Sequence, residues 1–301
     1  TFMESIFRYV HKGRIHADIN QLRSEFGGTV TGRFSMTHPN LQQIPKTGSD
    51  MGDQLRAIFV PEEGHRWGCF DYSQQEPRLV VHYAALTGLP GADEFKEDYD
   101  KNPKADFHKI VSDMAGIPRD QAKTINLGKF YGMGKNKLKG ELGIEDDKAE
   151  DIIRQYDARV PFVKQLMNHA MGRAEQRGQI RTLLGRLCHF HLWEPNQFGI
   201  HKPLTHEAAL VEHGPGIKRA FTYKALNKLI QGSAADMIKK AMLDLYNEKI
   251  IPLIQIHDEL NISIEDESQT KKVIEIMENA VSLEVPNKVD FESGKHWGEI
   301  E

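Results

Sequence analysis

The stretch LIQIHDELNISI, residues 253–264, raises the question that decides the fold. Its apolar residues alternate with polar ones, which is the pattern of a half-buried β-strand. The residues on the apolar parity are Ile254, Ile256, Leu260, Ile262 and Ile264. Asp258 falls on the same parity, where a carboxylate is costly unless a partner compensates it or the chain turns. We expect two strands whose connecting turn projects Asp258 from the sheet edge, with an ordinary acidic turn as the alternative.

A second acidic motif lies far away in the sequence, in CFDYSQQEPR at residues 69–78. A strand that ends at Asp71 places a carboxylate where the chain leaves the sheet, although Asp71 is also a favourable N-cap for a following helix. If this strand neighbours the 253–264 strands, Asp71 and Asp258 come together. They then supply hard oxygen ligands for two Mg²⁺ ions about 3.5–4 Å apart, as in-line phosphoryl displacement requires.

A third motif, PRDQAKTINLGKFYG at residues 118–132, has helical spacing. Arg119, Lys123, Leu127 and Tyr131 recur every four residues, so they share one helix face. Two cations followed by an apolar and an aromatic group suit a triphosphate and a stacked base. The alternative is a helix whose Leu127 and Tyr131 are core residues and whose cations are solvated. Residues 121–140 hold five lysines and no acidic residue, although the formal net charge of the chain is −4.

Composition indicates a globular protein. The chain has 301 residues, of which 39% are apolar, and its two cysteines cannot form a disulfide framework. There is no apolar run of eighteen residues and no signal-peptide pattern, so we expect an intracellular protein without a membrane partner. The start at Thr1 suggests an excerpt of a longer chain.

The remaining pattern predicts loops, strands and helices in a particular order. Residues 27–47 read as loop, and residues 56–63 and 65–73 read as two short strands joined by a turn. An acidic stretch with Pro and Gly spans residues 88–104. Helices are predicted at residues 75–86, 105–115, 118–131, 146–177, 217–248 and 268–282. This order predicts β structure at both ends and a helical insertion at about 86–215.

These segments together resemble the motifs of family A DNA polymerases, the group of bacterial DNA polymerase I and its phage and organelle relatives. DYSQQEPR resembles the first palm motif, RDQAKTINLGKFYG the fingers-helix motif, and IHDEL the second palm motif. TGRFSMTHPNLQQIP at 31–45 and LNKLIQGSAADMIKKAM at 226–242 resemble two further segments, in the same order. The resemblance spans nearly the whole chain.

The resemblance implies a template-directed DNA polymerase that uses two Mg²⁺ ions, with Mn²⁺ as a substitute, to join dNTPs to a primer 3′-hydroxyl. Asp71 and Asp258 are then the metal-binding carboxylates, the Tyr72 carbonyl is a further ligand, and Glu259 assists. Lys123 is expected to act in catalysis by protonating pyrophosphate. The residues implied in nucleotide binding are Arg119, Lys123, His108, Gln74, Glu76, Leu127, Tyr131 and Tyr72.

Selectivity and DNA contacts follow from the same resemblance. Glu76 is similar to the steric gate that excludes a ribose 2′-hydroxyl. The residues implied in contacts with primer–template DNA are Arg33, Asn227, Gln231, His257 and Gly132. Leu127 departs from the family pattern, which has Phe or Tyr at this position, so we expect sugar discrimination and dideoxynucleotide acceptance to differ.

The fold expected from the resemblance is an α+β right-hand palm, an antiparallel sheet flanked by helices, with inserted helical fingers. The expected palm comprises residues 1–85 and 216–301, and the fingers comprise residues 86–215. No segment resembles a thumb or an exonuclease domain, so the expected partner is an N-terminal portion or a separate subunit. The expected location is the cytoplasm of a bacterium or phage-infected cell, or an organelle. Two alternatives are a single-subunit RNA polymerase, which Glu76 disfavours, and a catalytically silent DNA-binding subunit.

Overall fold

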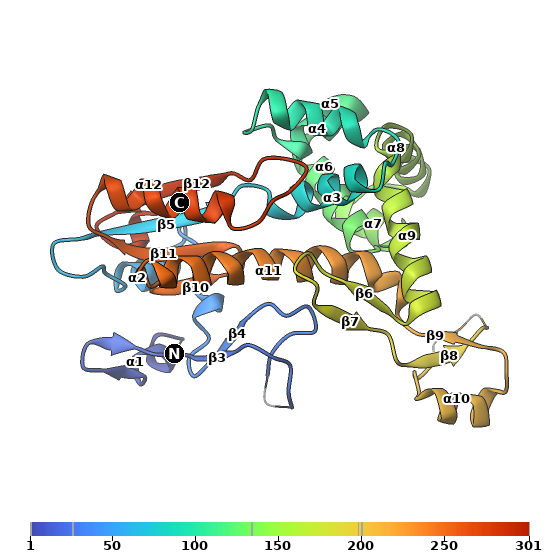
Figure 1. Cartoon of the computed structure of the whole chain (residues 1–301), viewed down its shortest axis with the longest axis horizontal. Helices are drawn as coiled ribbons and strands as arrows, with labels where there is room; N and C mark the ends of the chain where they lie inside the picture. The colour runs from blue at the N-terminus through green and yellow to red at the C-terminus, as the bar shows by residue number, and fades with distance from the viewer. Residues whose placement is uncertain (1, 26, 134, 198, 200, 301) are drawn as a thin grey trace. The chain divides into compact units, whose positions relative to one another are not determined.

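The computed structural model describes residues 2–25, 27–133, 135–197, 199 and 201–300 (Figure 1). The chain divides into two compact units, each of which has its own core. Unit 1 comprises Thr1–Gln75 and Ala234–Glu301, and unit 2 comprises Glu76–Ser233. Two helices contain the boundaries: α3 (Gln75–Leu86) begins at the last residue of the first segment, and α11 (Ala225–Asn247) contains the second boundary.

Unit 1 is built around a four-stranded antiparallel sheet in the order β10-β11-β5-β12. These strands are β5 (Arg66–Tyr72), β10 (Ile254–Ile256), β11 (Glu259–Ile264) and β12 (Val289–Gly294). The other elements of the unit are α1 (Phe2–Phe7), β1 (Val10–His11), β2 (Arg14–Ile15), β3 (Asp18–Asn20), β4 (Ser35–Thr37), η1 (Leu41–Gln43), α2 (Asp50–Ala57), α12 (Glu267–Asn279) and η3 (Trp297–Glu299).

The predicted hairpin in residues 253–264 is confirmed. Ile256 pairs with Glu259, so His257 and Asp258 alone form the turn between β10 and β11. His257 has a φ of +53°, a left-handed conformation that tight two-residue turns require and that few side chains adopt readily. Because the chain turns here, Asp258 leaves the sheet. Ile254 and Ile256 share a face with Asn261 and Glu259, and the apolar residues of β11 lie on the opposite face.

The two faces of the central strand β5 are buried against different elements. Trp67 and Cys69 belong to a core that includes Leu55 of α2 and Trp297 of η3, and the two tryptophan rings stack with centroids 6.0 Å apart. On the other face, the buried Tyr72 hydroxyl donates to the carbonyl of Met277 in α12 at 2.6 Å. Successive residues of β5 point to opposite faces of the sheet, and each face is therefore packed against its own set of elements.

Unit 2 is mainly helical, with two small antiparallel hairpins, β6-β7 and β8-β9. Its core includes an aromatic cluster of Phe95, Phe107, Phe130 and Phe162, whose neighbouring ring centroids lie 5.1–6.5 Å apart. Besides most of α3 and the start of α11, its elements are α4 (Ala92–Lys101), α5 (Phe107–Ala115), α6 (Arg119–Phe130), α7 (Lys135–Leu142), α8 (Asp146–Arg159), α9 (Pro161–Arg177), β6 (Gln179–Arg181), β7 (Leu187–His189), β8 (Trp193–Pro195), α10 (His206–His213), β9 (Ile217–Arg219) and η2 (Thr222–Lys224).

Several predicted elements differ from the structure. The strand predicted at residues 56–63 is wrong, because α2 runs to Ala57 from a Ser49 N-cap and no strand follows before β5. The helix predicted at 146–177 is two helices, because Pro161 has no amide hydrogen and begins α9. The helix predicted from residue 217 begins only at residue 225, after β9 and η2. Helix α4 was not predicted within the Gly- and Pro-containing stretch, although Phe95 and Tyr99 have helical spacing and are buried.

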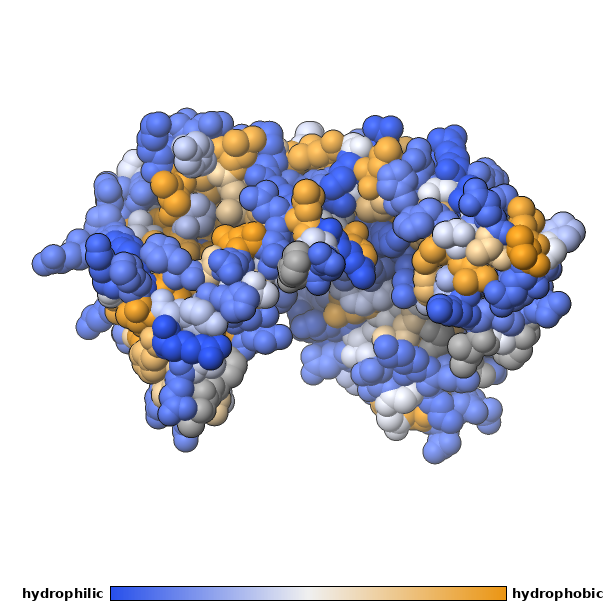
Figure 2. Space-filling model, turned by 90° about the horizontal axis from the view of Figure 1, so that it is seen from below, coloured by the Kyte–Doolittle hydropathy of each residue, from blue (hydrophilic) through white to orange (hydrophobic). Residues whose placement is uncertain are grey.

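The surface gives no sign of a membrane-spanning helix. Within the described ranges, no helix combines the length and the apolar character needed to cross a bilayer. The face seen in Figure 2 is mainly hydrophilic, with smaller hydrophobic patches among the polar residues.

Candidate active site

The two predicted acidic motifs meet in the sheet of unit 1, as expected. In β5, Asp71 pairs directly with Glu259 of β11 and with Asp290 of β12. Directly paired residues share a face of the sheet, so three carboxylates form a row across three strands. Asp258 lies next to this row, and its carbonyl accepts a hydrogen bond from the Tyr72 amide at 3.3 Å.

The electrostatics of Asp71 show that this row has excess negative charge. Burial is the largest cause that raises the pKa of the Asp71 carboxyl, and together with the charges of Asp258, Glu259 and Asp290, opposed by Lys46, it brings the pKa to about 8. A carboxyl group responds in this way when too few cations or donors compensate it. A cation bound beside these carboxylates would therefore be stabilised by their negative charge.

The residues present fit a hard divalent cation by their chemistry. Carboxylate and carbonyl oxygens are the ligands of Mg²⁺, and the negative charge of the row would be neutralised by such an ion. In the part of the chain that the structure describes, no three His, Cys, Asp or Glu side chains converge as a metal-binding group. The predicted set does not need three, because it combines the carboxylates of Asp71 and Asp258 with the backbone of Tyr72. The Tyr72 side chain is buried toward α12, so only its backbone could serve as a ligand or contact a nucleotide.

Glu259 is held by side chains on the core side of the row. Asn261, two residues further along β11, donates from Nδ2 to Glu259 Oε1, and Trp67 donates from Nε1 to Asn261 Oδ1 at 2.7 Å. Burial and the nearby carboxylates raise the pKa of the Cys69 thiol well above its usual value, so Cys69 stays protonated and hydrogen-bonds to Glu259. Glu259 therefore has two donors in the sheet.

In unit 2, the predicted face of α6 is the accessible one. Arg119 and Lys123 are exposed and Leu127 and Tyr131 are half-buried, whereas residues of the opposite face are buried. Within the described residues, Lys123 makes no hydrogen bond and no ion pair, so its ammonium group is available to an anion. The buried residues of the helix are Ala122, Ile125, Asn126, Gly128 and Phe130.

Arg119 and His108 have partners that the sequence did not predict. Arg119 Nε donates to Asp106 Oδ2 at 2.6 Å. Burial of Asp106 opposes its ionisation, but the bond from Arg119 and the amides of Lys109 and His108 outweigh burial and lower the pKa of that carboxyl. Desolvation lowers the pKa of His108 to about 4, so its imidazole is neutral at pH 7.

The orientation of the His108 ring is set by Asn126. Asn126 is fully buried, and its Nδ2 lies 2.9 Å from His108 Nδ1. If the amide donates, Nδ1 is the acceptor and the proton is on Nε2. Nε2 would then be the ring's donor toward a phosphate.

Glu76, the predicted steric gate, is fixed by Tyr131. The Tyr131 hydroxyl donates to Glu76 Oε2 at 2.5 Å, and Glu76 is 9% exposed. The next residue, Gly132, has a φ of +68°, and a Cβ there would lie 2.8 Å from the Tyr223 carbonyl oxygen. The glycine is therefore required by the backbone, whatever its contact with DNA. Gln74 has a φ of +52° in the turn between β5 and α3.

The predicted DNA-contacting residues are divided between the two units. Arg33 is half-buried and His257 is exposed in unit 1. Asn227 and Gln231 lie one turn apart on the part of α11 that belongs to unit 2, and both are half-buried. Each side chain retains surface for a ligand.

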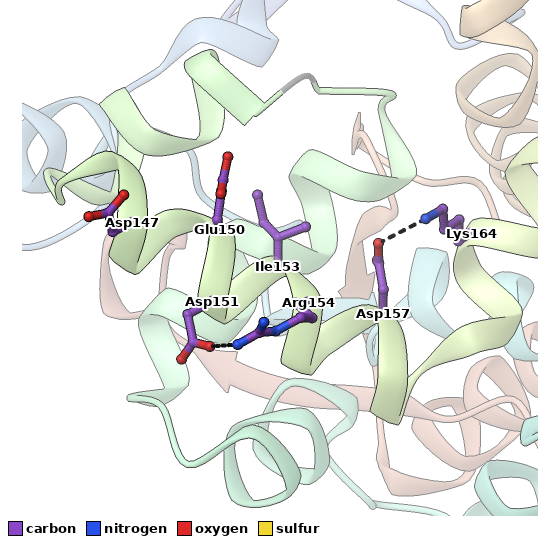
Figure 3. Close-up of a pocket in the computed structure, with 7 residues that line it drawn as sticks. All are labelled: Asp147, Glu150, Asp151, Ile153, Arg154, Asp157 and Lys164. Carbon is purple, nitrogen blue, oxygen red and sulfur yellow. Dashed lines mark hydrogen bonds and ion pairs between the residues drawn. The ribbon is translucent and has the colours of Figure 1, made fainter.

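A hollow of about 630 Å³ on α8 and the start of α9 contains none of the predicted site residues (Figure 3). Its two cations pair with carboxylates of the hollow: Arg154 donates to Asp151 at 2.5 Å, and Lys164 lies 3.5 Å from Asp157. Both of its cations are paired with its own carboxylates, and it contains none of the predicted ligands, so we do not place the chemistry there. The residues that line it are Asp147, Glu150, Asp151, Ile153, Arg154, Asp157 and Lys164.

Sequence reasoning missed several residues of these sites. Asp290 was missed because no element was predicted after residue 282, although Val289 and Phe291 alternate with acidic residues as in a strand. Asp106, an N-cap, and Asn126, a polar residue on a buried helix face, gave no separate signal. Asn261 and Lys46 act through strand pairing and loop placement, which local patterns do not predict.

Comparisons with known proteins show which family the chain is similar to over nearly its whole length. The family model for DNA polymerase family A matches residues 1–299. The DNA-directed DNA polymerase of Pseudomonas phage M6 is 34% identical over 346 residues, which cover 99% of this chain and 49% of that protein. DNA polymerase I of Geobacillus stearothermophilus is 36% identical over 314 residues, covering 99% and 33%.

A solved structure is similar over the same range. The POL domain of Pol1 from M. smegmatis, in complex with DNA primer-template and dNTP, matches with a TM-score of 0.78 and 30% identity. The match covers 99% of this chain and 50% of that one. The chain thus spans half or less of the length of these relatives, with a mixed α and β fold that resembles a family A polymerase domain. The chain belongs to DNA polymerase family A.

Proposed function

We propose that this chain performs template-directed nucleotidyl transfer, joining a dNTP to a primer 3′-hydroxyl with release of pyrophosphate. The observation that supports it most is the carboxylate row at Asp71, beside Asp258, with its uncompensated negative charge. Residues 1–85 and 216–301 would form the palm and residues 86–215 the fingers. Relatives that are longer than this chain suggest that a further segment or subunit adds DNA contacts.

In this proposal the carboxylates hold the metal ions that family A polymerases require. Asp71 and Asp258 would bind two Mg²⁺ ions together with the Tyr72 backbone carbonyl. Held by these residues, the ions would supply activation of the 3′-hydroxyl and neutralisation of charge on the leaving pyrophosphate. Glu259 would add its charge from beside the ligands.

The α6 face would bind the triphosphate. Lys123 has no competing partner in the described chain, so it is the strongest candidate to grip the phosphates and to donate a proton to pyrophosphate. Arg119 would share its guanidinium between Asp106 and a phosphate, and the neutral His108 would donate from Nε2.

The remaining residues would select the nucleotide and follow the DNA. Glu76, held by Tyr131, would occupy the space of a ribose 2′-hydroxyl, and Leu127 would pack on the sugar. Gln74, two residues before Glu76 in the sequence, would contribute to nucleotide binding. Arg33, Asn227, Gln231, His257 and Gly132 would contact the primer terminus and the minor groove, whose acceptors are similar for every base pair.

Primer extension with Mg²⁺ tests the proposal. The wild-type chain should extend a primer with dNTPs and discriminate strongly against rNTPs. Asp258→Asn should lower the extension rate by about 10³-fold or more while primer–template binding, measured by fluorescence anisotropy, is retained. Asp244→Asn is the matched control, because Asp244 pairs with Lys240 on α11 and should matter little.

The outcomes separate three classes of protein. A wild type that binds DNA but extends no primer would instead support a silent DNA-binding subunit. Equal use of rNTPs and dNTPs would support an RNA polymerase-like enzyme.

A further inference from the structure

A buried chain of hydrogen bonds runs from Trp67 through Asn261 to Glu259. Trp67 is 1% exposed and Asn261 is fully buried, so neither side chain exchanges its hydrogen bonds with water. Buried polar groups are costly unless they are paired, and a buried asparagine in the middle of a strand needs a reason. Here both ends of its amide are used.

The tryptophan fixes which way the amide points. An indole N–H is a donor only, so the atom of Asn261 that faces it must be the carbonyl oxygen. The Nδ2 group of Asn261 is then obliged to face Glu259, where it meets an acceptor. Replacing the indole would remove this constraint, and the amide could turn its oxygen toward the carboxylate.

Both donors to Glu259 lie on the same side of it. Asn261 pairs with Cys69 across β11 and β5, two positions toward the core from the pair of Glu259 and Asp71. The Asn261 amide and the Cys69 thiol therefore draw the Glu259 carboxylate along the sheet toward the core. The carboxylate stays near Asp71 as a fixed charge.

We propose that Asn261 and Trp67 are positioning residues, which hold the Glu259 carboxylate beside the cation site so that it raises cation affinity without occupying a ligand position. This rests on the proposed function only in taking Asp71 and Asp258 as the ligands. Partners that orient the surroundings of a metal typically change affinity or activity 10- to 100-fold, and residues one step further out should have a smaller effect.

Binding of Mn²⁺ to the free chain, without DNA or nucleotide, measures this directly by electron paramagnetic resonance of unbound Mn²⁺. Asn261→Val should raise the apparent Kd for Mn²⁺ about 3- to 10-fold, because Glu259 then has to be ordered by the ion. Trp67→Phe keeps an aromatic ring against Trp297 and should shift the Kd in the same direction by about 2-fold. If the first variant fails to fold, the second still gives a result.

A matched control separates positioning from general stability. Asn287 is also a buried asparagine of unit 1, and its Nδ2 donates to the carbonyls of Glu278 and Val281. Asn287→Val loses similar hydrogen bonds, none of which involves one of the four carboxylates, and its Kd for Mn²⁺ should equal that of the wild type. Glu259→Gln provides the second comparison: adding Asn261→Val to it should weaken binding no further.

The proposal is overturned if Asn261→Val binds Mn²⁺ as tightly as the wild type, if its effect multiplies with that of Glu259→Gln, or if the wild type binds no Mn²⁺. Primer extension is scored separately. A chain that shows the expected Mn²⁺ pattern but extends no primer keeps the positioning role and loses the proposed polymerase function.

Discussion

Replacing Tyr131 by Phe is expected to weaken discrimination between dNTPs and rNTPs. The change removes one atom, the hydroxyl that donates to Glu76 Oε2 at 2.5 Å, and leaves the ring on the α6 face. Glu76 is 9% exposed, so its carboxylate depends on protein donors more than on water. Without this donor the proposed gate would be held less firmly in the space of the 2′-hydroxyl.

The magnitude follows from the type of bond. A hydrogen bond to a charged group contributes about 1.5–3 kcal/mol, which in a unit the size of Glu76–Ser233 corresponds to about 3–12 °C in Tm. Glu76 has a further interaction in the structure, so we expect values toward the lower end. If about 1.4 kcal/mol of this loss falls on gate placement, the dNTP-to-rNTP ratio of kcat/KM falls about 10-fold.

The assay is single-nucleotide extension with dNTP and rNTP, alongside thermal unfolding. Tyr99→Phe is a matched control in the same unit, because the Tyr99 hydroxyl is buried and has no hydrogen-bond partner within the described chain. Removing that hydroxyl should leave Tm equal or higher and the ratio unchanged. A Tyr131→Phe enzyme with the wild-type ratio would refute the role of the bond in nucleotide selection.

Three further changes test other groups. Burial and neighbouring carboxylates raise the pKa of Asp71 from 3.8 to about 8, so the folded metal-free protein keeps a proton that the unfolded chain releases. The wild type should therefore lose stability relative to Asp71→Asn as pH rises from about 4 to 8. Denaturant unfolding in EDTA measures this, and an opposite trend would contradict it. Desolvation lowers the pKa of His108 from 6.5 to about 4, so His108 contributes stability above pH 6.5 that is lost as pH falls toward 4. In the same experiment, His108→Gln should lose less unfolding free energy on acidification than the wild type. An equal loss in both proteins would count against this role. Leu127→Tyr should change the ratio of dideoxynucleotide to deoxynucleotide incorporation, and equal ratios in variant and wild type would remove Leu127 from sugar recognition.

The sequence predicted the meeting of Asp71 and Asp258 for a physical reason. An uninterrupted strand would carry Asp258 on the same face as the alternating apolar residues, so a turn between Ile256 and Glu259 was expected, and that turn leaves Asp258 outside the sheet. The α6 face was predicted in the same way, since its period separates Lys123 from the buried Ile125. Both predictions rest on the spacing of polar and apolar residues that lie close together in the sequence.

Features that depend on register between distant segments were not predictable. Asp290 joins the row only because β12 pairs with β5, and two apolar residues are too weak a signal for that strand. The bond from Trp67 to Asn261 crosses strands nearly two hundred residues apart. The wrong strand at 56–63 shows the same limit. Arg56 lies in the last turn of α2, and its guanidinium packs 4.3 Å from the centroid of the Trp297 ring, a distant contact that local propensity does not indicate.

The burial of both cysteines makes the chain convenient for labelling. Cys69 is 6% exposed with a raised thiol pKa, and Cys188 is 5% exposed, so neither should react readily with maleimides, which attack accessible thiolates. A cysteine introduced at an exposed position of each unit would then be modified selectively, with both native thiols left in place. Fluorophores attached at those two positions would report the distance between the units, in the free chain and with each ligand in turn.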